Sequence, residues 1–454
     1  MPHYDLAVIG SGSGNSLIGP DFDDWQIAII EESTFGGTCL NVGCIPTKMY
    51  VYPADRAEAA RHSARLGVDA SVSGVRWADI RDRVFGRIDP ISAGGREYRA
   101  HGEANTTLYE GHAAFTGPHE LTLSSGEVIT ADRIVIATGS RATVPDVVTA
   151  GGVPFHTSDT VMRIDDVPAR VAILGGGYIA AEFAHILSAF GARTTVIARS
   201  APLLRELDLE VAQRFTDVVQ DRWDVRVKTR VERVEPLGDA VRLTLDDGTS
   251  VDADLLLVAT GRVPNSDRLD LAAAGVDVHP DGRIVVDEFQ RTSADGIWAL
   301  GDVSSQYQLK HVANHESKVV AHNLAHPEAM RESDHRFVPS AVFTHPQLAS
   351  VGLTAEQAAA SGRRFVSVVQ DYGSTAYGWA MDDSTSVCKL IADPGTGQLL
   401  GAHLMGEQAS TLIQPLIQAM SFGLGVREMA RGQYWIHPAL TEVIENALLS
   451  LDLG

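Results

Sequence analysis

Residues 5–14 read DLAVIGSGSG, a short apolar strand that runs directly into a glycine-rich turn. Residues 171–180 read VAILGGGYIA and repeat this layout. A strand followed by closely spaced glycines lets backbone N–H groups approach a pyrophosphate at the start of a helix. One such motif is weak evidence, because glycine-rich turns are common, but two copies predict two dinucleotide sites.

Two further apolar strands end in Ala-Thr-Gly: residues 134–139 read IVIATG, and residues 256–261 read LLVATG. Each closes one of the two glycine-rich units. The second unit lies inside the first, because features of the first resume at residues 297–302, IWALGD. After these units the pattern changes to short strands at 365–370 and 387–391 and a helix at 408–422. That mixture is typical of an α+β domain.

We therefore expect an α/β protein with two Rossmann-like dinucleotide-binding domains, one inserted in the other, followed by an α+β domain. The expected boundaries are 1–145 and 266–335 for the first nucleotide domain, 146–265 for the second and 336–454 for the third. The size agrees, since 454 residues are too many for one hydrophobic core. The 44% apolar and 21% charged residues are ordinary values for a globular protein.

The formal net charge of −21 disfavours nucleic acid and anionic membranes as partners, because both would repel an acidic protein. No apolar run approaches the length of a membrane span, and the strand at residues 6–9 is too short for the core of a signal peptide. We therefore expect a cytoplasmic protein.

Cys39 and Cys44 lie in residues 36–48, GGTCLNVGCIPTK. Thiols this close can close a small, strained and easily reduced disulfide ring. A structural disulfide is disfavoured by the expected compartment and by the total of three cysteines. Zinc would need further ligands at a suitable spacing, which the chain lacks. Cys388 lies in an apolar strand and is expected in a core. The pair beside a dinucleotide motif predicts a flavin that passes electrons to a dithiol.

In the first unit, Glu31 ends an apolar strand about twenty residues after the glycines, where a carboxylate accepts hydrogen bonds from a ribose. Glu32 is the neighbouring alternative, but the end of the strand favours Glu31. Asn15 replaces the third glycine of the pattern, and Gly19-Pro20 follows. We therefore expect the first helix to be short or broken.

In the second unit the equivalent strand, residues 194–198, is followed by Arg199 rather than by an acid, and Arg205 comes soon after. A carboxylate would repel the 2′-phosphate of NADPH, whereas guanidinium groups bind it with two parallel hydrogen bonds. The alternative is that both arginines are merely solvated. The pattern predicts NADPH in the second unit and, by elimination, FAD in the first.

Together these motifs resemble the flavoprotein pyridine nucleotide-disulfide reductases, the group that contains glutathione reductase and lipoamide dehydrogenase. The resemblance covers nearly the whole chain and includes residues 437–442, HPALTE, which look like the catalytic His-Glu pair of that family. It implies that the third domain forms a homodimer. It also implies that Cys44 lies nearer the flavin, while Cys39 attacks the substrate.

The resemblance assigns further roles. His437, supplied by the partner subunit and oriented by Glu442, would act as acid and base for the thiols. Lys48 would pair with Glu182 beside the flavin, and Tyr178 would cover the nicotinamide face. The implied FAD-binding residues are Gly10, Gly12, Gly14, Glu31, Gly37, Thr38, Lys48, Thr138, Gly139, Gly301 and Asp302. The implied NADPH-binding residues are Gly175, Gly177, Tyr178, Ile179, Arg199, Arg205 and Gly261.

Within the group, residues 85–90, 156–162, 377–381 and 430–437 resemble the mycothione reductases, which reduce mycothiol disulfide. Glutathione reductases carry an arginine in their first helix for their anionic substrate. Residues 16–24 here contain three aspartates and no basic residue, so a neutral, sugar-linked disulfide fits better.

Several alternatives stay open. Glutathione reductase-like and lipoamide dehydrogenase activities use the same fold, although the latter runs on NAD and is disfavoured by the two arginines. A mercuric reductase would need an extra cysteine pair near the C-terminus. A non-catalytic flavin-binding protein need not retain both thiols and a His-Glu pair.

Overall fold

The computed structural model describes residues 1–454 and divides into two compact units. Unit 1 comprises Met1–Thr47, Asp79–Thr143 and Gly261–His335, and unit 2 comprises Lys48–Ala78, Val144–Thr260 and Arg336–Gly454. The chain therefore leaves and re-enters unit 1, as expected for one nucleotide domain inserted in another. The assignment of three domains with the boundaries given above stays a prediction.

Unit 1 is built on a seven-stranded sheet in the order β3-β2-β1-β6-β5-β4, with β16 also paired to β6. Its strands are β1 (His3–Ile9), β2 (Ile27–Glu31), β3 (Thr106–Glu110), β4 (Ala113–Gly117), β5 (Glu120–Leu123), β6 (Val128–Ile136) and β16 (Ile297–Ala299). The strands β3, β2, β1, β6 and β16 run parallel, as a doubly wound fold requires. A separate antiparallel pair joins β7 (Ser140–Ala142) to β15 (Arg262–Pro264).

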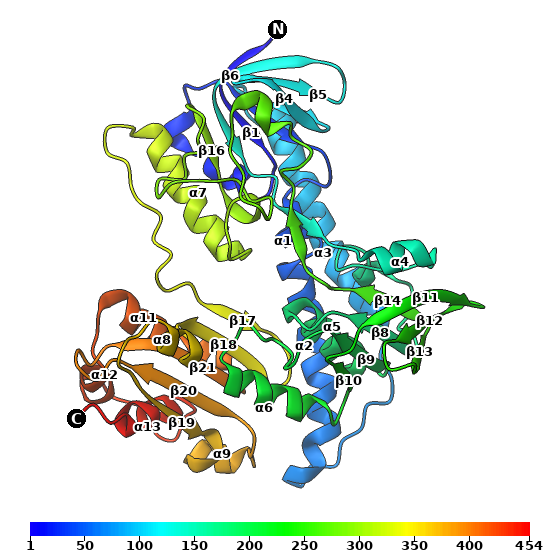
Figure 1. Ribbon diagram of the computed structural model, residues 1–454, viewed down its shortest axis with the longest axis vertical. Helices are drawn as coiled ribbons and strands as arrows, with labels where there is room; N and C mark the ends of the chain where they lie inside the picture. Colours follow the sequence, from blue (N-terminus) through cyan, green and yellow to red (C-terminus); the bar gives the residue numbers. More distant parts are fainter. The chain divides into compact units, whose positions relative to one another are not determined.

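Helix α7 (Lys310–Ala325) covers one face of this parallel sheet, where Val320 and Leu324 pack on apolar residues of β1 and β2 (Figure 1). The turn after β1 forms only two short 3-10 helices, η1 (Gly14–Leu17) and η2 (Pro20–Phe22). The prediction of a short or broken first helix is therefore confirmed. Pro20 explains the break, because it stands at the start of η2, where its fixed φ and missing N–H are tolerated.

Three helices follow the glycine-rich turns of unit 1 in sequence. They are α1 (Gly37–Asn41), α2 (Cys44–His62) and α3 (Trp77–Glu97). The two predicted redox cysteines thus lie on α1 and at the first residue of α2.

The nucleotide-binding part of unit 2 contains a parallel sheet in the order β10-β9-β8-β14. Its strands are β8 (Arg170–Leu174), β9 (Arg193–Ala198), β10 (Asp224–Val227) and β14 (Leu255–Val258). The helices of this part are α4 (Asp146–Gly151), α5 (Tyr178–Ala189) and α6 (Leu209–Val219). An antiparallel sheet adds β11 (Val231–Leu237), β12 (Ala240–Leu245) and β13 (Ser250–Ala253).

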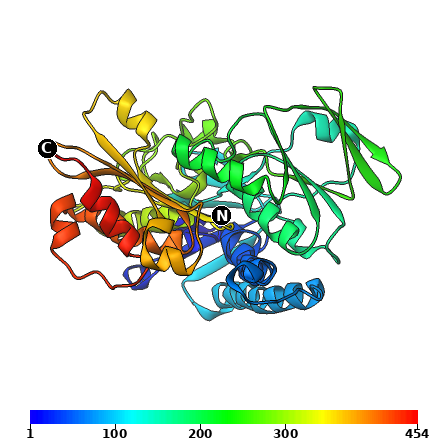
Figure 2. The ribbon, with the colours of Figure 1, turned by 90° about the horizontal axis from the view of Figure 1, so that it is seen from below.

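The C-terminal part of unit 2 is an antiparallel sheet in the order β17-β18-β21-β20-β19. The strands are β17 (Ser340–Val342), β18 (Gln347–Gly352), β19 (Val366–Asp371), β20 (Val387–Ala392) and β21 (Leu399–Gly406). The helices are α8 (Ala355–Ala360), α9 (Ala376–Ala380), α10 (Ala409–Leu412), α11 (Gln414–Phe422), α12 (Val426–Arg431) and α13 (Glu442–Ser450). Helix α13 lies along β19 and β20, as both ribbon views show (Figures 1 and 2).

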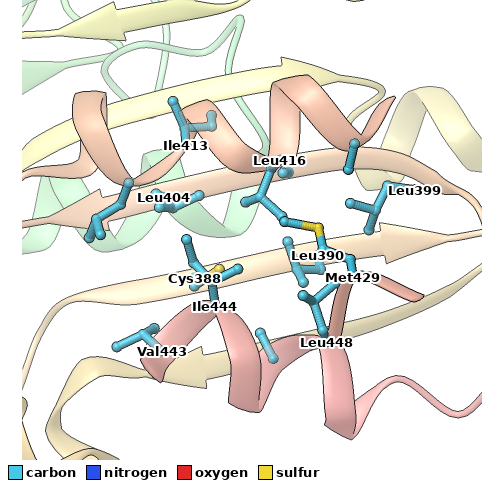
Figure 3. Packing of buried hydrophobic residues seen from close by; sticks show 14 of the residues in the cluster. Cys388, Leu390, Leu399, Leu404, Ile413, Leu416, Met429, Val443, Ile444 and Leu448 are labelled. Atoms are coloured by element: carbon cyan, nitrogen blue, oxygen red, sulfur yellow. The ribbon is translucent and has the colours of Figure 1, made fainter. Parts of the chain in front are cut away.

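The single helix expected at 408–422 was wrong: α10 and α11 are separate, and Pro415 stands in the first turn of α11, where proline cannot continue a preceding helix. Cys388 is fully buried in the core between the sheet and its helices, next to Leu404 and Ile444 (Figure 3). The prediction that Cys388 is a core residue is therefore confirmed. No helix of the structure combines the length and hydropathy that crossing a bilayer requires.

Candidate active site

Cys39 and Cys44 approach each other closely enough for their thiols to share a hydrogen bond. This hydrogen bond, followed by burial, raises the pKa of Cys39 above its ordinary value, and the positive charge of Lys310 acts in the opposite direction. Cys44 is exposed and Cys39 half-buried in the isolated chain, the reverse of the exposure expected for their roles. The thiols are placed to form the small ring, while their division of labour stays a prediction.

The first glycine of each motif is required by a close backbone contact. Gly10 has a φ of +107°, and a methyl group added to it would lie 2.4 Å from the carbonyl oxygen of Ala137. Gly175 has a φ of +133°, and its added methyl would lie 2.1 Å from the carbonyl oxygen of Ala259. Both alanines belong to the Ala-Thr-Gly segments, so the two repeated motifs of the sequence pack against each other in each unit. Only glycine fits there.

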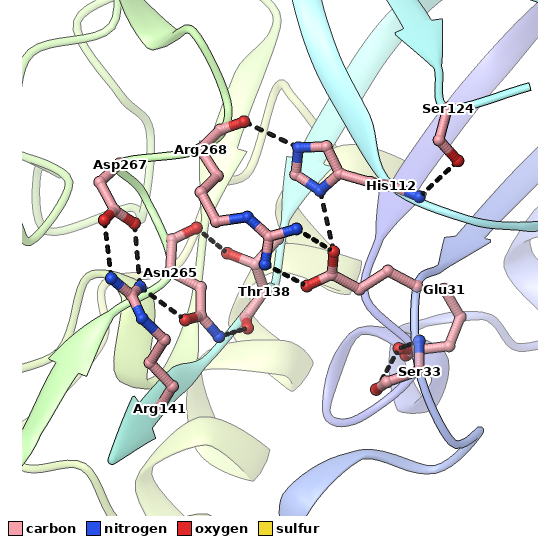
Figure 4. A network of polar contacts seen from close by, with 10 residues as sticks. Glu31, Ser33, His112, Ser124, Thr138, Arg141, Asn265, Asp267 and Arg268 are labelled. Carbon is pink, nitrogen blue, oxygen red and sulfur yellow. Dashed lines mark hydrogen bonds and ion pairs between the residues drawn. The ribbon is translucent and has the colours of Figure 1, made fainter. Parts of the chain in front are cut away.

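Glu31 is the last residue of β2 and is held from both sides. One carboxylate oxygen accepts hydrogen bonds from the backbone N and Oγ of Ser11, at 2.8 and 2.6 Å. The other accepts two from Ser33 at 2.9 Å, which Figure 4 shows. The Ser11 hydroxyl also accepts from Gly36 N, which ties the first glycine loop to the loop before α1. These contacts fix a carboxylate at the strand end, where a ribose-binding group is expected.

A network of polar side chains surrounds this strand end (Figure 4). Glu32 pairs with Arg268 at 2.8 Å and with His112 at 3.0 Å, so its carboxylate is already engaged by two cationic or polar groups. Asn265 donates to the carbonyl of Thr138 at 2.9 Å, and its N–H group bonds the carbonyl of Gly139. Both carboxylates are therefore engaged, and the assignment of Glu31 rather than Glu32 to the ribose stays a prediction.

The residues implied to hold the far part of the flavin also lie in unit 1. Gly301 begins the 3-10 helix η7 (Gly301–Val303), and its N–H donates to the buried Glu316 at 2.7 Å. Asp302 accepts a hydrogen bond from Ser140 Oγ at 2.6 Å. Lys310, at the start of α7, donates to Ser13 Oγ in the glycine loop at 2.8 Å.

These polar groups fit a flavin dinucleotide: a carboxylate to accept from the ribose, an ammonium group beside the pyrophosphate loop, and a carboxylate near the ribityl position. The loops also meet without side chains between them, since a methyl on Gly37 would lie 2.7 Å from the Cα of Gly12. Gly14 opens η1, and Thr38 lies next to Cys39 on α1.

Lys48 and Glu182 form an ion pair inside unit 2. The Lys48 ammonium lies 2.8 Å from both carboxylate oxygens of Glu182 and 4.7 Å from the centre of the Phe343 ring. Phe343 also donates its backbone N–H to Glu182 at 3.1 Å. The Glu182 side chain is 5% exposed and that of Lys48 34% exposed, so the pair has one buried and one accessible end. The expected pairing is present, and its role beside a flavin stays a prediction.

The second glycine motif leads into α5. Gly177 caps the helix, and Tyr178 and Ile179 form its first residues, with the Tyr178 side chain largely exposed. Arg199 follows β9, is exposed and contacts no acid, whereas Arg205 is exposed and lies 3.1 Å from Glu206. Gly261 follows the Ala-Thr segment after β14. The Arg199 guanidinium is therefore free to meet a phosphate, whereas Arg205 already pairs with Glu206, and the role of both with NADPH stays a prediction.

Glu442 is the first residue of α13, and His437 lies in the segment that precedes this helix. His437 Nδ1 is 3.4 Å from Glu442 Oε2, and the histidine side chain is 70% exposed while that of Glu442 is 19% exposed. Glu442 Oε2 is buried and has no hydrogen-bond partner. A carboxylate in this position can orient the imidazole through Nδ1, and the acid-base role of the pair stays a prediction.

Sequence reasoning missed several contributors: Lys310 beside Ser13, the backbone of Phe343 at Glu182, and Glu316 below Gly301. Each is a single residue outside any motif: Lys310 and Phe343 are 297 and 161 residues from their partners, and Glu316 is 15 residues from Gly301. No local signal could have identified them.

Residues 4–317 match the family described as pyridine nucleotide-disulphide oxidoreductase, and residues 338–448 match the dimerisation domain of that family. The chain is 55% identical to a protein named mycothione reductase from Mycobacterium tuberculosis, covering 99% of this chain and 100% of the relative. It is 33% identical to a glutathione reductase from Burkholderia cepacia, covering 97% of each.

Among solved structures, the HOCl-induced flavoprotein disulfide reductase RclA from Escherichia coli superposes with a TM-score of 0.86 at 28% identity, covering 98% of this chain and 100% of RclA. The expected architecture of two Rossmann-like domains and an α+β dimerisation domain is confirmed. Membership implies a flavin and a pyridine nucleotide as cofactors. The chain belongs to the pyridine nucleotide-disulphide oxidoreductase family.

Proposed function

We propose that this protein reduces mycothione to mycothiol with electrons from NADPH, through FAD and the Cys39–Cys44 pair. The observation that carries the reaction class is the contact between the two thiols on α1 and α2. The substrate assignment is supported by the 55% identity, over the full length, to a protein named mycothione reductase. The expected place of such a thiol system is the cytoplasm.

The flavin would be held by three charged side chains of unit 1. Glu31 would accept hydrogen bonds from the ribose, Lys310 would neutralise pyrophosphate charge, and Asp302 would accept from the ribityl chain. When bound, the flavin supplies a two-electron relay from the nicotinamide to the disulfide. NADPH would lie along Gly175–Gly177, with Arg199 and Arg205 on the 2′-phosphate.

The thiol chemistry balances over one turnover. The Cys39 thiolate attacks one sulfur of the substrate disulfide, a new S–S bond forms, and the first thiolate product leaves. The Cys44 thiolate then attacks the Cys39 sulfur, which releases the second thiolate and restores the Cys39–Cys44 disulfide. Each departing thiolate takes up a proton. Two electrons and protons from NADPH and solvent return the pair to the dithiol state.

A base is needed because the pKa of Cys39 is raised by the Cys44 hydrogen bond and by burial. His437 of the partner subunit would take this proton and return it to the leaving thiolate. Glu442 would hold the imidazole by Nδ1 and stabilise its protonated form. We therefore propose a homodimer as the active state, in keeping with the match to a dimerisation domain.

Charge near the glycine loop supports a neutral substrate. Asp21, Asp23 and Asp24 are all exposed, and residues 16–24 contain no basic side chain. A disulfide carrying several carboxylates would be repelled there, while a sugar-linked disulfide without net charge would not.

The test is NADPH oxidation by the flavin-loaded protein with mycothione, glutathione disulfide and lipoamide offered separately. Turnover with mycothione alone supports both the reaction and the substrate. Preference for glutathione disulfide would indicate a glutathione reductase-like enzyme. Preference for lipoamide with NADH would indicate a lipoamide dehydrogenase and contradict the assignment of Arg199 and Arg205.

A further inference from the structure

The nucleotide-binding part of unit 2 contains an open cavity of about 680 Å³ that no role has been given. The ends of α2 and α5 and the beginnings of β8 and β9 form its walls. Arg170 and Arg193 are the first residues of these two strands, whereas Gly175 and Arg199 follow the opposite ends of the same strands. The cavity therefore lies at the other edge of the parallel sheet from the glycine motif, about five residues of strand away, or roughly 16 Å.

The cavity is positively charged although the protein is acidic. Four arginines line it against a single carboxylate, so the lining carries a formal charge of +3 with His62 neutral, in a chain of net charge −21. The lining arginines are Arg61, Arg170, Arg193 and Arg222. The carboxylate is Glu58: burial raises its pKa, but the charge and hydrogen bond of Arg222 outweigh burial and hold it below the ordinary value. Glu58 is therefore ionised at neutral pH.

Most of these guanidinium groups are held in place by partners. Arg222 donates to Glu58 at 3.2 Å and is 15% exposed, and Arg61 donates to Glu58 at 3.0 Å and to the Ala189 carbonyl at the end of α5. Arg170 is bound by Asp254, which lies outside the lining. Since a guanidinium carries five N–H donors, these contacts orient the groups and leave each of them with further donors.

The ends of helices α2 and α5 offset part of the positive charge of the lining. The last carbonyls of α2 and α5 carry about half a negative charge each, and basic residues at helix ends compensate it. The two helix ends together offset about one positive charge, and Asp254, which pairs with Arg170, offsets another. Of the formal charge of +3, about one positive charge therefore remains.

That remaining charge corresponds to Arg193, which lies on a strand, is exposed and has no acidic partner. Arg193 is directly in register with Arg170 on the neighbouring strand. Adjacent strands are about 4.8 Å apart, and because Asp254 holds Arg170, Arg193 is left as the guanidinium at this edge without an acidic partner.

We propose that this cavity binds a small organic phosphate. A phosphate group offers several oxygens to guanidinium forks that are already fixed in orientation. The volume lies within the roughly 300–1,000 Å³ of small-molecule sites, and it exceeds what inorganic phosphate alone would fill. The proposal does not depend on which disulfide the enzyme reduces.

The experiment is calorimetric titration of the flavin-loaded enzyme, saturated with NADP⁺ so that the glycine-motif site is filled. Glucose 6-phosphate, inorganic phosphate and uncharged glucose are added in separate arms. We expect glucose 6-phosphate to bind, glucose not to bind, and inorganic phosphate to bind more weakly. Arg193→Gln should weaken binding of glucose 6-phosphate roughly tenfold or more, because one bidentate contact is lost.

Arg233→Gln is the matched control. Arg233 lies on β11, is 65% exposed, pairs with Glu235 and lies outside the cavity, and its removal changes the net charge by the same amount. It should bind glucose 6-phosphate like the unmodified enzyme. Equal binding by Arg193→Gln and Arg233→Gln, or no binding of either phosphate by the unmodified enzyme, would overturn the site. Equal affinity for the two phosphates would overturn the organic occupant.

Discussion

The ion pair between Lys48 and Glu182 gives the sharpest energetic prediction. It can be tested with a double-mutant cycle of Lys48→Met, Glu182→Gln and the combined variant. Both contacts measure 2.8 Å, and hydrogen bonds between charged groups contribute about 1.5–3 kcal/mol when shielded from water. Exposed pairs contribute only about 0.2–1 kcal/mol. Because one end of this pair is 5% exposed and the other 34%, we expect a coupling energy of about 2 kcal/mol.

The assay is urea unfolding of the four proteins at equal flavin load, at neutral pH. A coupling of about 2 kcal/mol corresponds to a roughly 30-fold change in the unfolding equilibrium. Arg96 and Glu110 form the matched control, because they make an equally close bidentate pair at 2.7 and 2.6 Å but are 45% and 60% exposed. Their coupling should be too small to resolve. If the Lys48–Glu182 coupling were no larger than that of the control, the reasoning from burial would be refuted.

Four further predictions follow from the site and the cores. His437→Ala should lower disulfide turnover about 100- to 10,000-fold while stopped-flow reduction of the flavin by NADPH keeps its rate, because only the acid-base step is lost. Arg199→Ala should raise KM for NADPH roughly tenfold or more and leave KM for NADH unchanged in steady-state assays. Cys388 should resist alkylation by iodoacetamide at pH 8 until the protein unfolds, since burial raises its pKa to about 12. His403 is buried, and burial lowers its pKa, so the unfolded chain takes up a proton at a higher pH than the folded chain does. The free energy of unfolding should therefore fall as the pH drops from about 6.5 to the pKa of the folded state. Urea unfolding at several pH values should show a smaller loss of stability on acidification for His403→Gln.

Each of these has an outcome that contradicts it. Loss of flavin reduction in His437→Ala would move the histidine out of the acid-base role. An equal rise of KM for NADPH and NADH would mean that Arg199 does not recognise the 2′-phosphate. Labelling of three thiols in the folded, reduced enzyme would contradict the burial of Cys388. Identical pH profiles of unmodified and His403→Gln protein would remove the linkage.

The features that the sequence predicted well are local ones. A strand followed by glycines needs only ten residues to be recognised, and the close contact of Gly10 with Ala137 shows why the motif tolerates no side chain. The short first helix was likewise predictable, because Pro20 and Asn15 lie within the segment concerned. The pairing of Lys48 with Glu182 came from family resemblance, not from any pattern in the residues themselves.

The features that the sequence did not predict depend on chain segments brought together by folding. Lys310 reaches Ser13 only because α7 packs on the sheet that carries the glycine loop. The arginine-lined cavity joins the ends of two helices to the beginnings of two strands, and none of its residues forms a motif. The break before Pro415 was missed because the apolar spacing continues across it.

In the proposed mechanism, Cys39 and Cys44 form a second redox centre in addition to the flavin. Anaerobic titration of the flavin-loaded enzyme with dithionite tests this most directly, by counting electrons taken up per flavin. We expect four electrons for the unmodified enzyme and two for Cys44→Ser. Uptake of only two electrons by the unmodified enzyme, equal to that of Cys44→Ser, would contradict it.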